Sequence, residues 1–299
     1  MLSLKNIRHL IYVRNEFLRK LRFCYYFWRR NRYWPDFDNP KTYNEKVNFR
    51  KRNAKNELFS VCSDKIAAKK WVAERVGEEY VIPNYFVGEF ITADKLREII
   101  AEKGDCLLKA NHNSGPVKIL TKESTDREIE EACKDINNQL KVDFGEKVGE
   151  PWYSKIKPGV LVEKRLEPEE GESDIRDYKF HVFKQADGDV KIFVAVDFDR
   201  RTNHSRSFFD AEFNYMHLST KVPSIRTSLR KPENFEKMLE LAKKLAEPFS
   251  YVRVDLYNVG GRIYFGEMTF APGGGYSDQF ESYKYDLWMG RLWQGDPSC

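Results

Sequence analysis

Several features that would place this chain of 299 residues in a common class are missing. No uninterrupted apolar run approaches the roughly 20 residues that cross a bilayer, and the first residues lack the apolar core of a secretory signal. The five cysteines are odd in number and form no C-x-x-C pair, which argues against a disulfide framework and a zinc site. We therefore expect a cytoplasmic protein with reduced thiols.

Familiar catalytic signatures are scarce as well. The Gly-Lys-Ser order of a Walker loop is absent. No Ser-His-Asp order or reactive-cysteine context stands out, so a hydrolase is not favoured. What the chain does have is 41% hydrophobic and 14% aromatic residues, enough to bury one large core or two linked lobes.

Positive charge is concentrated at the start of the chain. Residues 1–34 hold nine Lys or Arg and one acid, so this arm carries +8 and the rest of the chain carries −3 against a net charge of +5. A mildly acidic body argues against a general nucleic-acid binder, whose basic surface more often lies on the folded domain. We expect no nucleic-acid partner.

The arm also has an amphipathic pattern. Apolar residues recur at roughly helical spacing among the basic ones: Leu4, Ile7, Leu10, Ile11, Phe17, Leu18, Leu21 and Trp28. One interpretation is a helix that contacts an anionic membrane surface, on the inner face of the membrane. The other is an ordinary helix packed on the body with a solvated basic face. The aromatic cluster 25–28 slightly favours an interface, because such rings prefer a half-wet boundary.

The remaining chain predicts an α+β protein with largely antiparallel sheets. Thr42 and Glu45 have capping-box spacing and predict a helix start. Further helices are expected over 64–76, 92–103, 124–142 and 232–247. Strands are expected over 81–87, 106–110, 117–121, 160–165, 178–184, 190–197 and 207–209, and a hairpin over 251–257 and 262–268.

The most informative segment is Arg253-Val254-Asp255, followed by a hairpin and Glu267-Met268-Thr269. Residues two apart on a strand share a face, and Glu267 can lie beside Asp255 across the hairpin. Mg²⁺ takes one or two carboxylates plus phosphate oxygens, and an arginine can neutralise a transferring phosphoryl group. The alternative is a cross-strand salt bridge on a solvated face. A backbone-rich, mobile loop over 271–275 favours substrate binding.

Two upstream segments could contact a nucleotide. Lys109 ends a strand and leads into a polar loop with Ser114 and Gly115, an arrangement that can hold phosphate through backbone N–H groups and an ammonium. The strand 161–166 leads into an acidic turn and could offer backbone groups to an adenine edge, although an ordinary sheet strand would have the same sequence. Within the loop, His112 is equally compatible with a structural role.

A basic loop, 199–206, contains Arg200, His204 and Arg206. Arginine binds carboxylate or phosphate bidentately, so we predict capture of an anionic substrate. A solvated turn is the alternative.

The chain resembles the TupA-like ATP-grasp family of surface-polysaccharide biosynthesis proteins. The similarity runs from about residue 40 to 285 and rests on several blocks in one order. These blocks are 42–46, 67–83, 108–112, 177–180, 199–204 and 265–270.

The resemblance implies an ATP-grasp fold, in which two α+β lobes with antiparallel sheets clamp ATP. By family role, Lys109 and Lys179 would hold ATP phosphates. The adenine hinge would comprise Glu163, Lys164, Arg165 and Leu166. Asp255 and Glu267 would bind Mg²⁺, and Arg253 would face the reacting phosphate. Thr269 stands where the wider superfamily commonly has Asn, and its hydroxyl can still bind a metal.

This resemblance divides the chain into four parts. Residues 1–38 would form the arm, 39–104 an N-terminal α/β region, 105–165 the small lobe, and 166–299 the large lobe with the metal and substrate site. The implied activity is ATP-dependent joining of a carboxylate to an amine through an acyl phosphate. The implied partners are a uronic acid of a glycan or nucleotide sugar and an amino acid or other small amine.

Three rival functions stay open from the sequence. ATP-grasp proteins include kinases, so phosphorylation of a sugar intermediate is one. A glycosyltransferase could use Asp197-Phe198-Asp199 to bind the metal of a nucleotide sugar. A scaffold without catalysis is the third, against which the presence of Lys109, Asp255 and Glu267 argues.

Overall fold

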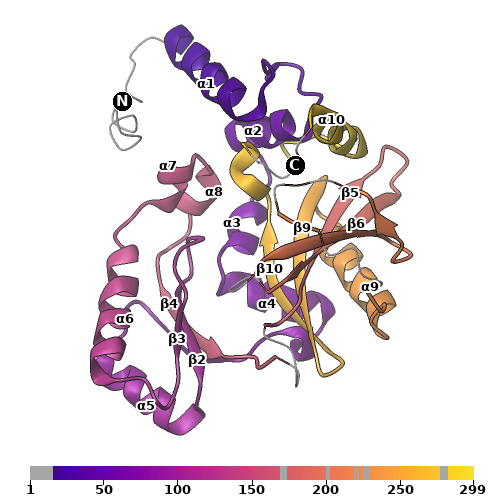
Figure 1. Cartoon of the computed structure of the whole chain (residues 1–299). Coiled ribbons are helices and arrows are strands. Elements are labelled where there is room, and N and C mark those ends of the chain that lie inside the picture. Colours follow the sequence, from indigo (N-terminus) through magenta and orange to yellow (C-terminus); the bar gives the residue numbers. More distant parts are fainter. Residues whose placement is uncertain are drawn as a thin grey trace.

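Two antiparallel sheets form the framework of the protein (Figure 1). The computed structural model describes residues 16–168, 174–199, 203–218, 220, 222–224, 229–276 and 282–299. The small sheet has the strand order β1-β4-β2-β3 and the large sheet the order β10-β9-β5-β6-β7-β8. This arrangement confirms the predicted α+β class.

The small sheet contains β1 (Asn84–Gly88), β2 (Cys106–Ala110), β3 (Lys118–Leu120) and β4 (Val160–Lys164). The helices α5 (Ala93–Lys103) and α6 (Asp126–Gln139) cover its outer side (Figure 1). Their apolar faces and the strands β2 and β4 share one buried cluster, which includes Leu108, Ile136 and Val162. Thr92 and Thr125 cap the two helices through their hydroxyl groups.

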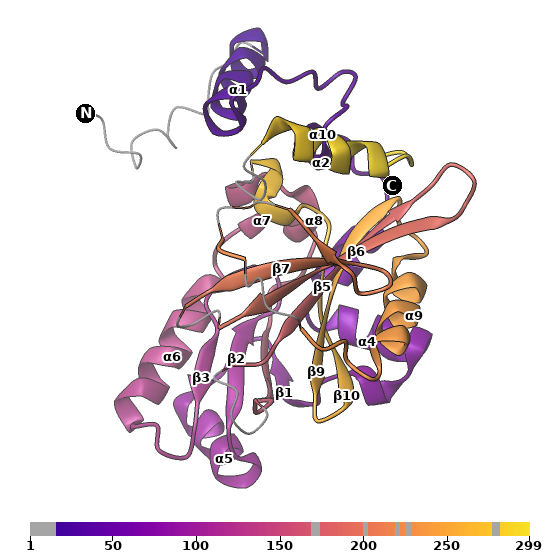
Figure 2. The same ribbon diagram turned by 45° about the vertical axis from the view of Figure 1, so that its right-hand side comes forward.

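The large sheet contains β5 (Asp177–Lys184), β6 (Val190–Phe198), β7 (Ser205–Asp210), β8 (Tyr215–Met216), β9 (Tyr251–Val259) and β10 (Arg262–Thr269). The helix α9 (Phe235–Ala246) packs on β9 and β5. Figure 2 shows α9 on the side of this sheet away from the small lobe. Side chains from α9, the sheet and the helices before β1 form the larger of the two cores.

The remaining helices connect or cover the lobes. They are α2 (Tyr43–Asn53), α3 (Leu58–Ser63), α4 (Ala67–Val76), α7 (Phe144–Val148), α8 (Pro151–Ser154) and α10 (Tyr283–Leu292), with short 3₁₀ turns η2 (Glu78–Tyr80) and η3 (Pro272–Gly275). Thr42 and Glu45 form the predicted capping box at the start of α2. The helix expected over 64–76 begins only at Ala67, because Asp64 accepts the amide of Ile66 and the side chain of Asn111.

The residues expected to form an N-terminal region over 39–104 divide between the two cores. The helices α2, α3 and α4 contribute to the larger core, whereas α5 contributes to the smaller one and β1 pairs in the small sheet. Arg50 on α2 explains part of this arrangement. Its buried guanidinium donates to the carbonyls of Tyr251 and Cys299, so it ties α2 to the large sheet and to the end of the chain.

The basic arm is helical where it is described, as α1 (Glu16–Asn31). Residues 1–15, with Leu4, Ile7, Leu10 and Ile11 of the predicted pattern, lie outside the described residues. Cys24 and Phe27 are buried in a small cluster with Phe37, so one face of α1 packs on the body. Within the described residues, no helix is both long and apolar enough to cross a bilayer.

Candidate nucleotide and metal site

A row of charged side chains crosses the large sheet. The strand register places Glu267 of β10 opposite Asp255 of β9, and Asp255 opposite Lys179 of β5. Directly paired residues on antiparallel strands project to the same face, so these three side chains are neighbours on one surface. The sequence predicted the first pair from the hairpin, and the structure brings Lys179 beside it.

Arg253 holds the two predicted metal carboxylates. Its guanidinium donates to both oxygens of Asp255, each at 2.7 Å, and to Glu267 Oε1 at 2.9 Å. It also donates to Thr269 Oγ1 at 3.0 Å. Burial opposes the charge of Arg253, but the attraction of Asp255 and Glu267 outweighs it and raises the pKa of the guanidinium. The four residues predicted from this segment therefore form one contact group.

The two carboxylates differ in their surroundings. Asp255 is buried, and burial raises its pKa despite the opposing pull of Arg253 and Lys179. The side chain of Glu267 is 49% exposed. Desolvation by the surrounding chain disfavours the charged form of Glu267. The attraction of Arg253 and Lys65 is larger and lowers the pKa of this carboxyl. Glu267 is thus an ionised, accessible carboxylate beside a buried one.

Lys179 lies among three carboxylates. Its ammonium pairs with Asp177, with Asp197 Oδ2 at 3.1 Å and with Asp255 Oδ2 at 3.7 Å. Among the described residues, Arg206 pairs with Asp197, and Arg253 pairs with Asp255 and Glu267. Carboxylates gathered in this way are the ligands that Mg²⁺ prefers.

Asp197 organises the basic residues of β7. Arg206 donates to both of its oxygens, at 2.5 and 2.9 Å, and His204 Nε2 lies 3.0 Å from Oδ1. Burial opposes the charge of Asp197, but Arg206 and Lys179 outweigh it and lower the pKa of the carboxyl. His204 and Arg206 are thus brought together, whereas Arg200 lies outside the described residues.

These contacts weaken the glycosyltransferase interpretation. Metal binding by an Asp-x-Asp triplet needs open carboxylates, but Asp197 is fully buried, pairs with Lys179 and Arg206, and contacts His204. Asp199 has a left-handed backbone, with φ of 49°. Asp197 is therefore part of an ion-pair network inside the large lobe.

The small lobe presents a second lysine. Lys109 of β2 pairs with Glu163 of β4, and Lys69 of α4 donates to the other oxygen of Glu163 at 2.8 Å. Burial disfavours the charge of Glu163, but the two ammonium groups prevail and lower its pKa. The side chain of Lys109 is 19% exposed and that of Glu163 only 4%. Lys109 is consequently positioned to reach a ligand, and the buried Glu163 orients the Lys109 side chain.

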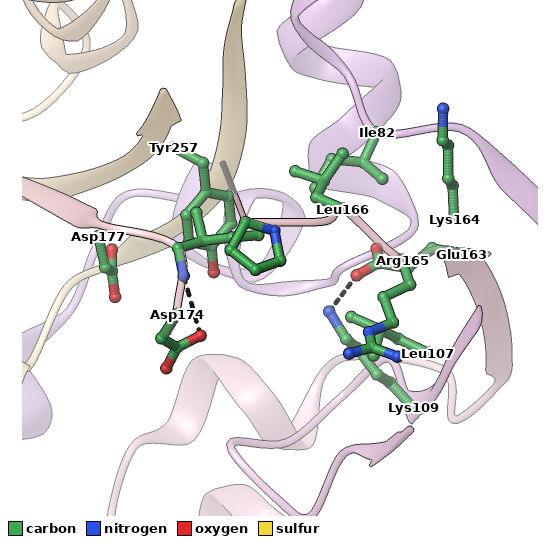
Figure 3. A pocket seen from close by; sticks show the side chains of 12 residues that line it. Ile82, Leu107, Lys109, Glu163, Lys164, Arg165, Leu166, Asp174, Asp177 and Tyr257 are labelled. Carbon is green, nitrogen blue, oxygen red and sulfur yellow. Dashed lines mark hydrogen bonds and ion pairs between the residues drawn. The ribbon is translucent and has the colours of Figure 1, made fainter. Parts of the chain in front are cut away.

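A cavity of about 360 Å³ lies between the two lobes (Figure 3). Small-lobe residues line one part of it, namely Leu107, Lys109, Glu163, Lys164, Arg165 and Leu166. Asp177 and Tyr257 of the large sheet line another part. Lys109 and all four residues of the predicted adenine hinge thus line the same cavity as Asp177, the ion-pair partner of Lys179.

Two backbone donors of the hinge are already used. The amide of Lys164 donates to the carbonyl of Pro83, and that of Arg165 donates to the carbonyl of Asp105. Adenine contacts at the hinge would therefore rely on its other backbone groups. Ser114 and Gly115 are not among the residues that line this cavity, and they lie in the turn between β2 and β3.

Lys65 is a site residue that sequence reasoning missed. Its ammonium donates to the carbonyl of Asn113, within the loop that also contains Ser114 and Gly115. Burial lowers the pKa of Lys65 to about 8. Repulsion from Lys109 also lowers this pKa, whereas attraction to Glu267 raises it. The charges of Glu267 and Lys109 therefore both act on Lys65. No motif surrounds it, so only the fold identifies it.

The glycine-rich loop after β10 differs from the predicted mobile loop. It forms the turn η3, in which Asn48 donates to the carbonyl of Gly275 at 2.7 Å and Lys51 to that of Gly274 at 3.1 Å. Gly275 has φ of 70°, and a Cβ there would lie 2.4 Å from the Asn48 side chain. These glycines permit close packing against α2.

The carboxylate pair fits a metal that is shared with a ligand. Among the described residues, no group of three or more His, Cys, Asp or Glu side chains is arranged to hold a metal. Asp255 and Glu267 supply two oxygen donors on adjacent strands, which matches the way Mg²⁺ binds through one or two carboxylates and substrate phosphates. The hydroxyl of Thr269 lies 3.4 Å from Glu267 and could add a third oxygen.

Comparison with known proteins gives a family and a fold. The profile of the family described as TupA-like ATP-grasp matches residues 45–294. D-Alanine-D-alanine ligase from Helicobacter pylori has a similar structure, with 15% identity and a TM-score of 0.50, over 79% of this chain and 62% of that one. D-Alanyl-alanine synthetase A from Vibrio cholerae follows with 13% identity and a TM-score of 0.46, over 75% of this chain and 60% of that one.

This chain therefore spans less than two thirds of the length of these two proteins. No curated protein matches the sequence. The family match and the first of these structural similarities confirm the predicted ATP-grasp fold.

Proposed function

Because the chain belongs to the TupA-like ATP-grasp family, we propose that it uses Mg-ATP to activate a carboxylate and join it to an amine. The observation that supports this most is the cross-strand group of Arg253, Asp255 and Glu267. Next to it, Lys179 pairs with Asp177, and Asp177 lines the same cavity as Lys109 and the predicted hinge.

ATP would bind between the lobes. We assign the adenine to the cavity along Glu163, Lys164, Arg165 and Leu166. Lys109 and Lys179 would contact the phosphates from opposite sides, since one belongs to the small sheet and the other to the large sheet. Ser114 and Gly115 would contact the phosphates from the turn between β2 and β3.

Mg²⁺, when bound by Asp255, Glu267 and Thr269, would neutralise charge on the phosphates. Arg253 would orient the side-chain oxygens of Asp255, Glu267 and Thr269 and stabilise the γ-phosphoryl group during its transfer. The substrate carboxylate attacks the γ-phosphorus, the bond to the β-phosphate oxygen breaks, and ADP leaves. The amine then attacks the acyl carbon and displaces phosphate.

We propose that the carboxylate belongs to a uronic acid of a glycan or nucleotide sugar, and that the amine is an amino acid or other small amine. This part rests on the family resemblance. Arg200, Arg206 and His204 would contact the acidic substrate, with Asp197 fixing the orientation of the last two.

Nucleotide accounting tests the proposal. The protein is incubated with Mg-ATP, uronic-acid donors and a pool of amines, and ADP, phosphate and UDP are measured. A ligase sustains ADP release only when both the acid and the amine are present, because without the amine the reaction stops at the acyl phosphate. Hydroxylamine in place of the amine should trap the acyl phosphate as a hydroxamate. ADP release with a stable phosphorylated sugar would indicate a kinase instead, and UDP release without ADP a glycosyltransferase.

Glu267→Gln provides the matched variant for this assay. It removes one charge from a half-exposed side chain, so we expect the fold to persist while kcat/KM for ATP falls by about 100-fold or more. Glu131→Gln removes an exposed carboxylate on α6 and should leave turnover unchanged. Full turnover by Glu267→Gln would contradict the metal assignment.

A further inference from the structure

The helix α1 has two differently used faces. Cys24 and Phe27 are buried, and the Phe27 ring lies 5.3 Å from that of Phe37. On another face, Leu18, Leu21, Tyr25 and Trp28 are 41–48% exposed. Their spacing of three, four and three residues places them in one stripe along the helix. The body therefore holds α1 by one face and leaves an apolar stripe uncovered.

This stripe is unusual for the molecule. The described residues include twelve exposed large apolar side chains, and five of these lie between residues 18 and 34. The fifth is Trp34, which is 55% exposed just after the helix. We call Leu18, Leu21, Tyr25, Trp28 and Trp34 the arm surface. Exposed apolar groups gathered in this way mark an interaction site more often than an ordinary solvated face.

Positive charge flanks the arm surface. Arg29, Arg30 and Arg32 are exposed, and among the described residues no carboxylate pairs with any of them. The arm as a whole carries +8, whereas the rest of the chain carries −3. A partner of this surface must combine negative charge with an apolar layer. Tyr and Trp rings suit the boundary between lipid head groups and acyl chains.

We propose that the arm surface docks the protein on an anionic lipid bilayer. The helix would lie in the plane of the interface, with the stripe in the head-group region and the arginines on acidic lipids. This goes beyond the proposed ligase reaction and does not depend on it.

Contacts with α10 and with the segment after β10 fix the arm to the body. The Tyr33 hydroxyl donates to Asp286 at 2.5 Å, and Asp286 also accepts the amide of Asn44 at 2.9 Å. Tyr276, just after η3, packs against Phe23 of α1 with ring centroids 5.7 Å apart. Docking would therefore hold the large lobe in a defined orientation, with the segment after β10 next to the membrane.

Vesicle co-sedimentation of the full chain tests the proposal. The vesicles contain phosphatidylglycerol and phosphatidylcholine in a ratio of about 3:7, or phosphatidylcholine alone. We expect binding to the anionic vesicles only, weaker at about 0.5 M salt than at about 0.1 M. Leu21→Glu with Trp28→Glu should lower the partition coefficient about tenfold or more, and Arg29→Gln with Arg30→Gln by a similar factor.

Two controls match these variants. Lys243→Gln with Lys244→Gln removes the same charge from adjacent exposed residues of α9, and Phe90→Glu changes an exposed ring of the small lobe. Both should bind vesicles like the unaltered protein. Absence of binding to anionic vesicles, or equal binding by all variants, would overturn the proposal. A lipid-free dimer that dissociates in the Leu21→Glu and Trp28→Glu double variant would also overturn the proposal. In that case the partner of the arm surface would be a second copy of the chain.

Discussion

At the scale of single residues, Lys179 contributes to stability and, in the proposed function, to phosphate binding. It is buried with Asp177, Asp197 and Asp255, and its ammonium contacts all three. Breaking a buried ion pair by removing one partner is strongly destabilising, because the remaining charge stays uncompensated. A loss of activity in a Lys179 variant would thus report on folding as well as on phosphate binding.

We therefore predict that Lys179→Met lowers the free energy of unfolding by about 3–5 kcal/mol. Glu267→Gln should lower it by less than about 1 kcal/mol, because the Glu267 side chain is half exposed. Urea denaturation followed by circular dichroism measures both changes. Equal midpoints for Lys179→Met and the unaltered protein would contradict the buried network.

The residues also show what the sequence could and could not predict. Arg253, Asp255, Glu267 and Thr269 were found because strand alternation and a hairpin are visible as patterns, and the structure places them in contact. Lys65 was missed because it reaches the site through the loop at Asn113, a contact between segments 48 residues apart in sequence.

At the scale of elements, the clearest predictions came from local chemistry. The capping box of Thr42 and Glu45 predicted a helix start, and α2 begins there. The glycines at 77 and 104 predicted helix ends, and α4 and α5 end there. The helices α7 and α8 went unpredicted because they have five and four residues, too few for a periodic pattern. Tertiary packing, with Trp152 buried against Phe59, stabilises them instead.

The junction of α7 and α8 yields a prediction about pH. Burial raises the pKa of Glu150 from 4.5 to about 7, although nearby Lys51 opposes the shift. Between these two values the unfolded chain has released the proton while the folded protein retains it, so the contribution of Glu150 to stability falls as the pH rises.

Glu150→Gln should remove this dependence. The variant should exceed the unaltered protein by about 1–3 kcal/mol in unfolding free energy above pH 7, and the difference should vanish below about pH 4.5. Chemical denaturation at several pH values checks this. A difference that does not vary with pH would show that Glu150 titrates normally in the folded protein.

At the scale of the whole molecule, the function depends on how two lobes with separate cores meet. The small sheet supplies Lys109 and the predicted hinge, the large sheet supplies Lys179 and the proposed metal carboxylates, and the cavity lies between the lobes. The sequence indicated the two lobes through family resemblance. It could not show that α2, α3 and α4 belong to the larger core, because long-range contacts such as that of Arg50 with Cys299 carry no local pattern.

The most direct test is diffraction at the manganese edge from crystals grown with Mn²⁺ and a non-hydrolysable ATP analogue. We predict an anomalous peak within bonding distance of the carboxylates of Asp255 and Glu267. The adenine should lie along Glu163–Leu166 and the phosphates between Lys109 and Lys179. A metal bound elsewhere, or a nucleotide outside the cavity between the lobes, would contradict the account.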